Sequence, residues 1–126
     1  MFIDTHCHLF TRMKYLVVGF GLDDLVKEMD VAKVDKFVLF TLEGLFRNFH
    51  ASNDEIATAA HRFPQRIIPF GTINPWYGED ALKEMDRCVK VLKFKGFKLH
   101  PWMTSFPVNS ELMYPIVEKL SELNVP

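Results

Sequence analysis

The chain has 126 residues with a formal net charge of −1, and 48% of them are hydrophobic, which predicts a single folded domain over residues 1–126 and excludes a disordered segment. It contains no basic run typical of a nucleic-acid surface and no apolar stretch near the roughly 20 residues of a membrane-spanning helix. Its two cysteines, Cys7 and Cys88, and the absence of a signal peptide predict a reducing, cytoplasmic environment without disulfide bonds.

Strands and helices alternate from the first residues onward. Residues 2–8 predict a short strand, and residues 9–21 predict a loop with an apolar centre. Residues 22–34 predict a helix, because apolar residues recur at helical spacing and two aspartates occupy the first turn. The unbroken apolar run of residues 36–40 is typical of a buried strand in a parallel sheet.

The rest of the chain continues this alternation. The predicted elements are helices over residues 53–63, 79–92 and 115–123, and strands over residues 66–74 and 94–100. Ser52 or Asn53 is the expected N-cap of the first of these helices. His50 falls in the loop before that helix and His61 within it, and neither is predicted to have a function. Alternating strands and helices give parallel strands with right-handed crossovers, so the predicted class is α/β, as an open sheet or part of a barrel.

Three chargeable residues interrupt the first predicted strand. Side chains alternate along a strand, so Asp4, His6 and His8 are expected on one face and Cys7 on the other, toward the helices. His6 and His8 fall at the carboxyl end, where parallel α/β folds place their functional groups. Zinc and related cations accept imidazole nitrogen, so both histidines are candidate metal ligands. The alternative is a pair of partly buried histidines with ordinary hydrogen bonds.

The fourth predicted strand repeats this arrangement. Phe97 and Leu99 are expected to pack on the helices, which directs Lys98 and His100 to the same side as the histidine pair. Lys98 is a candidate for binding an anionic substrate or for forming a carbamate between two metals, and its alternative is an ammonium group that extends to solvent. His100 is the second candidate catalytic residue, although it also suits a simple strand end before a proline.

Four motifs taken together resemble the amidohydrolase-related metal-dependent hydrolases. They are I-D-T-H-C-H at residues 3–8, G-T-I-N-P at 71–75, K-G-F-K-L-H-P at 95–101 and Y-P-I-V-E-K-L-S-E-L-N-V-P at 114–126. The resemblance implies the N-terminal half, about four βα units, of a (β/α)₈ barrel with one or two divalent metal ions. Zinc is the expected ion, with manganese or iron as alternatives. The resemblance assigns the first two ligands to His6 and His8 and a lysine that can be carbamylated to Lys98.

The activities that this resemblance implies act on small molecules. They are hydrolysis of amides, esters or lactones, and non-oxidative decarboxylation. Relatives take further ligands from later strands, which would follow residue 126, so these residues alone are expected to be inactive. Two alternatives remain open. One is a TatD-like metal-dependent deoxyribonuclease, which shares the opening M-F-I-D-T-H-C-H-L but places a glutamate in the fourth strand. The other is a non-catalytic fragment that needs a partner, or a homo-oligomer formed through open sheet edges.

Overall fold

A computed structural model describes residues 1–9, 21–46 and 48–126, and the loop predicted over residues 9–21 lies outside them apart from its two ends. The helices are α1 (Leu22–Val31), α2 (Phe49–Arg62), α3 (Glu79–Lys90), α4 (Pro101–Thr104) and α5 (Tyr114–Leu123). The strands are β1 (Ile3–His8), β2 (Lys36–Phe40), β3 (Ile67–Pro69), β4 (Gly71–Thr72) and β5 (Phe97–Lys98). Three short 3-10 helices are η1 (Glu43–Leu45), η2 (Pro75–Tyr77) and η3 (Glu111–Met113).

The strands of the described residues pair in parallel, as the sequence predicts. β2 lies between β1 and β3, and β4 pairs with β5. Only Phe70 separates β3 from β4. Its N–H donates to the carbonyl of Leu39 at 3.0 Å, and the N–H of Gly71 donates to the carbonyl of Gly96 at 2.9 Å. One extended segment therefore changes partner from β2 to β5, next to Pro69, which has no N–H to donate. The predicted strand over 66–74 is two short strands for this reason.

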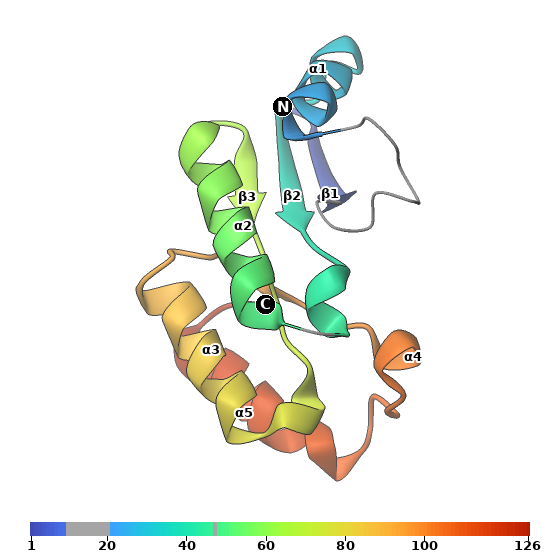
Figure 1. Cartoon of the computed structure of the whole chain (residues 1–126), viewed down its shortest axis with the longest axis vertical. Coiled ribbons are helices and arrows are strands. Elements are labelled where there is room, and N and C mark those ends of the chain that lie inside the picture. Colours follow the sequence, from blue (N-terminus) through green and yellow to red (C-terminus); the bar gives the residue numbers. More distant parts are fainter. Residues whose placement is uncertain (10–20, 47) are drawn as a thin grey trace.

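The hydrophobic core lies between the strands and the helices. It includes Cys7 of β1, Phe37 and Leu39 of β2, Val26 of α1, Ile56 and Ala59 of α2, Met85 and Cys88 of α3, and Ile116 of α5. Figure 1 shows α2 lying along β3, and α3 lying beside α5. Each fully buried aliphatic side chain of this kind contributes about 1.5–3 kcal/mol. Within the described part of the chain, no helix combines the length and apolar character needed to cross a membrane.

Helix α2 begins four residues earlier than the sequence predicts. Its N-cap is Asn48, whose side chain accepts a hydrogen bond of 3.0 Å from the N–H of Ala51. The predicted caps, Ser52 and Asn53, are buried within the helix instead. A consequence is that the loop prediction for His50 was wrong, because His50 belongs to the first turn of α2.

The fourth predicted strand is shorter than expected. Since β4 offers only two residues for pairing, only Phe97 and Lys98 have partners on it. The chain then enters the unpredicted helix α4, which begins at Pro101, a residue tolerated in a first turn. On the other edge of β5, the N–H of Phe97 donates to the carbonyl of Pro126 at 2.9 Å. Residue 126 thus lies beside β5, on the edge opposite β4.

Gly71 permits the close approach of β4 to β5, and its substitution tests this contact. A Cβ at this position would lie 2.6 Å from the ring of Phe97. We expect Gly71→Ala to lower the free energy of unfolding by about 1–3 kcal/mol, because the buried ring must move. Gly21→Ala is the control, since its nearest atom would be 3.8 Å away. Equal losses for the two variants in urea unfolding would contradict this role of Gly71.

Candidate active site

The imidazoles of His6 and His8 converge at the carboxyl end of β1. Their Nε2 atoms are 3.0 Å apart, and the ring planes are inclined by 78°. One ring nitrogen donates a hydrogen bond to the other in this arrangement. Two nitrogens that each lie roughly 2.0–2.1 Å from one tetrahedral ion are about 3.3 Å apart. The observed separation therefore fits two neighbouring positions around a single metal ion.

The buried ring of Phe40, at the carboxyl end of β2, connects the histidines with Lys98. Its centroid lies 5.3 Å from that of His6 and 4.6 Å from that of His8. The Nζ atom of Lys98 is 5.5 Å from the same centroid, within the range of a cation–π contact. Phe97 and Leu99 pack in or against the core. The expected shared side of the histidines and Lys98 is therefore confirmed, whereas their chemical roles remain predictions.

Burial and positive charge keep His8 neutral. Burial, together with the positive charges of His6, Lys98 and His100, lowers the pKa of His8 to about 4. A neutral imidazole is the form that binds a metal. His100 lies between β5 and α4, with its ring 6.2 Å from that of Trp102, and its charge contributes to the lowered pKa of His8. The structure thus brings His6, His8 and Lys98 together around Phe40.

Asp4 does not follow the expected alternation, and its predicted position was wrong. Asp4 lies opposite Phe37 and Cys7 opposite Leu39, so β1 contains one extra residue between these pairs. A bulge of this kind reverses the order of the faces. The Asp4 carboxylate interacts with the Cys7 thiol, and burial together with this interaction raises the pKa of Cys7 to about 12. The carboxylate also accepts a hydrogen bond of 2.9 Å from the N–H of His6. Asp4 therefore fixes the backbone beside the histidines.

The described residues contain no complete metal site. Across residues 1–9, 21–46 and 48–126, no group of three or more His, Cys, Asp or Glu side chains is arranged to hold a metal ion. A catalytic zinc site usually has three protein ligands and an open position. The histidine pair therefore fits part of such a site.

Comparison with known proteins identifies the relatives of the chain. The family model described as amidohydrolase matches residues 3–126. The chain belongs to the amidohydrolase family. The resemblance seen in the motifs is thus confirmed, and the converging histidines lie on the first strand of a member of this family.

Solved structures of larger enzymes share this fold at low identity. A manganese-containing 5-carboxyvanillate decarboxylase from Novosphingobium aromaticivorans has a TM-score of 0.81 and 20% identity, covering 100% of this chain and 49% of that one. A 2,6-dihydroxybenzoate decarboxylase from Rhizobium has a TM-score of 0.77 and 17% identity, covering 98% and 47%. A 4-oxalomesaconate hydratase from Rhodopseudomonas palustris has a TM-score of 0.74 and 22% identity, covering 100% and 51%.

The chain spans about half the length of the solved structures that it matches. Its parallel strands and their helices correspond to the N-terminal half of a (β/α)₈ barrel, which confirms the predicted fold class.

Sequence reasoning missed a second polar cluster, outside the histidine pair. The ring of His50 lies between Glu84 and Asp80 of α3, with its Nδ1 2.6 Å from the buried Glu84 carboxylate. A signal was available in the helical spacing. Glu84 lies three residues after Ala81 and four before Cys88, on the buried stripe of α3. A glutamate at such a position needs strong partners.

Proposed function

We propose that this chain supplies two metal ligands, His6 and His8, and a substrate-binding cation, Lys98, to a metal-dependent enzyme. The reaction class is hydrolysis of a small amide, ester or lactone, or non-oxidative decarboxylation of a small carboxylic acid. The observation that carries this proposal is the 3.0 Å approach of the two Nε2 atoms at the carboxyl end of β1. Chemistry in barrels of this kind takes place at that end of the strands. Membership of the amidohydrolase family supports the proposal.

The proposed cofactor is one divalent cation held by His6 and His8. Imidazole ligands favour zinc or iron, whereas the matched 5-carboxyvanillate decarboxylase contains manganese. We therefore propose zinc or manganese as the native ion, with Fe²⁺ as the alternative. When bound, the ion supplies a Lewis acid that polarises a substrate oxygen.

Lys98 and His100 are the residues that we propose to contact the substrate. The ammonium group of Lys98 lies over Phe40, close to the histidine pair, where it can bind a carboxylate through a charge-assisted hydrogen bond. The two matched decarboxylases are named for aromatic acids, which supports a small carboxylate as substrate. Carbamylation of Lys98 is the alternative role. His100 has an imidazole that can exchange a proton with the substrate.

The other functions remain alternatives. The TatD-like deoxyribonuclease is less well supported, because the family match is to an amidohydrolase and Lys98 stands where a glutamate is expected. A chain that needs a partner is supported by β1, which among the described strands pairs only with β2, and this edge also suits a homo-oligomer. A cytoplasmic location is supported by the buried free thiols of Cys7 and Cys88.

Metal binding tests the histidine pair directly. We expect one weak site for Mn²⁺ or Zn²⁺, because two imidazoles form an incomplete coordination shell. His6→Ala and His8→Ala should each weaken binding by at least about tenfold in isothermal titration calorimetry. His61→Ala is the control, since His61 is exposed on α2. Unchanged affinity in the first two variants would refute the assignment.

Binding of a small aromatic carboxylate tests Lys98. Loss of a hydrogen bond to a charged group typically costs about 1.5–3 kcal/mol, so Lys98→Ala should weaken binding of 2,6-dihydroxybenzoate by about 10–100-fold in an NMR titration. Lys83→Ala, on the exposed face of α3, should leave it unchanged. Metal content separates the two roles. If Lys98→Ala binds the acid more weakly but keeps its metal, Lys98 binds the substrate. If the variant loses both the metal and the affinity for the acid, Lys98 carries the carbamate.

Turnover tests the reaction class. We expect no turnover from the 126-residue chain, because its described residues offer no third metal ligand. A fusion to the C-terminal half of the matched 5-carboxyvanillate decarboxylase should release carbon dioxide from aromatic acids, or acid from esters, amides or lactones, only with Mn²⁺ or Zn²⁺. His6→Ala should abolish this activity. A folded, metal-loaded fusion that converts none of these substrates would contradict the proposal.

A further inference from the structure

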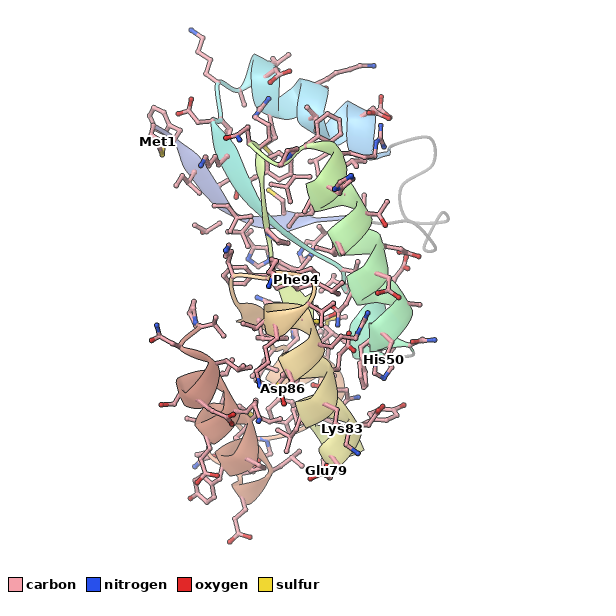
Figure 2. The ribbon with its side chains drawn as sticks, turned by 90° about the vertical axis from the view of Figure 1, so that its left-hand side faces the viewer. Met1, His50, Glu79, Lys83, Asp86 and Phe94 are labelled. Carbon is pink, nitrogen blue, oxygen red and sulfur yellow. The ribbon has the colours of Figure 1, made fainter. Side chains whose placement is uncertain are left out.

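A network of polar side chains that does not include His6 or His8 connects α2 with α3. Its centre is Glu84 of α3, whose side chain is 0% exposed. The Glu84 carboxylate accepts hydrogen bonds from Asn53 Nδ2 at 2.8 Å, from Arg87 Nε at 2.7 Å and from the ring of His50 at 2.6 Å. These partners lower the pKa of Glu84 to about 2, although burial alone would raise it. Figure 2 shows His50 at the end of α2 that approaches α3.

Both ring nitrogens of His50 face carboxylates. Nδ1 lies 2.6 Å from Glu84 Oε2, and Nε2 lies 3.1 Å from Asp80 Oδ2. Carboxylates only accept hydrogen bonds, and a neutral imidazole has only one N–H to donate. The two contacts together therefore require the doubly protonated imidazolium. Burial alone would lower the pKa of His50, but the hydrogen bonds to Asp80 and Glu84 raise it above its usual value.

The network continues from Glu84 into the sheet. Asn53, which donates to Glu84, also donates to the carbonyl of Thr72 at 3.1 Å and accepts from the N–H of Thr72 at 2.9 Å. Thr72 belongs to β4 and pairs in register with Lys98 of β5. A continuous series of hydrogen bonds thus connects the partly exposed His50 with the strand that lies beside Lys98.

Other charged or titratable groups surround His50 from each neighbouring element. Arg87 of α3 donates to the His50 carbonyl at 3.3 Å and to Asp54 of α2 at 2.7 Å. η1 and η2, which pack near the start of α2, carry Glu43 and Tyr77. Arg87 stays charged throughout the neutral range, so Glu84 keeps one cationic partner after His50 loses its proton. Deprotonation therefore weakens the contact between α2 and α3 without leaving Glu84 unpaired.

We propose that His50, Glu84, Asp80 and Asn53 form a pH-sensitive latch that holds α2 against α3 and β4 when His50 is an imidazolium and loosens when it becomes neutral. The proton leaves from Nε2 to solvent, because Asp80 is 55% exposed and can turn away, whereas Glu84 is buried. Nδ1 keeps its proton and donates a weaker, uncharged hydrogen bond to Glu84. The latch contains none of the residues proposed to hold the metal ion, His6 and His8.

The sign of the pH dependence follows from the raised pKa of His50. The unfolded chain binds this proton less tightly than the folded chain. The stabilisation is therefore complete below about pH 6.5, the ordinary value for histidine, and is lost as the pH rises through the folded pKa.

An NMR titration of the wild-type chain gives the first test. The Cε1–H signal of His50, assigned with His50→Gln, should titrate with a midpoint above 6.5, and Asp80→Asn should lower that midpoint. A midpoint at or below 6.5 in the wild type, or one that Asp80→Asn leaves in place, would overturn the proposal.

Urea unfolding between pH 6 and pH 8 gives the second test. The unfolding equilibrium constant of the wild type should rise with pH by at least about threefold more than that of His50→Gln. His61→Gln is the matched control, because His61 is an exposed histidine on the same helix, and this variant should follow the wild type. An equal pH dependence for His50→Gln and the wild type would overturn the latch.

Discussion

Parallel pairing of short strands is the constraint on which the candidate site depends. Because β1, β2 and the β3–β4 segment run in the same direction, their carboxyl ends meet at one edge, and β5 joins that edge through β4. The ring of Phe40 occupies this edge and contacts the side chains that arrive from both sides. The side chains of His6, His8 and Lys98 therefore meet around one aromatic ring, although Lys98 is far from the two histidines in the sequence.

The two clusters of chargeable groups differ in the protonation states that they stabilise. Around Phe40, the charges of His6, Lys98 and His100 act on His8, and the effect of burial and charge is to keep His8 neutral. Around Glu84, each cation faces at least one carboxylate, and the ionised forms are stabilised by hydrogen bonds. Under the proposed function, the neutral imidazole of the first cluster would bind a metal ion and its positive charges would attract an anionic substrate. The second cluster connects two helices through ion pairs.

Backbone irregularities shape both clusters. The extra residue in β1 turns Asp4 away from the imidazoles and toward Cys7, which leaves the histidines as a pair. The change of partner at Phe70 lets one segment hold β2 and β5 at once. Asn53 then fixes the end of that segment through both backbone groups of Thr72. In a regular sheet, Asp4 would share a face with His6 and His8, and β3 and β4 would not form one segment that holds both β2 and β5.

The sequence by itself determined the order of elements, the parallel α/β class and the shared side of His6, His8 and Lys98, because strand alternation and helical spacing are local properties of the chain. Its motifs also indicated the amidohydrolase family and half of a barrel. Only the tertiary structure decided the face of Asp4 and the contacts of His50. A bulge depends on the register with a partner strand, and the charge state of His50 depends on α3, which begins 29 residues later in the chain. Such features depend on interactions between residues that are distant in the sequence, so strand alternation and helical spacing do not predict them.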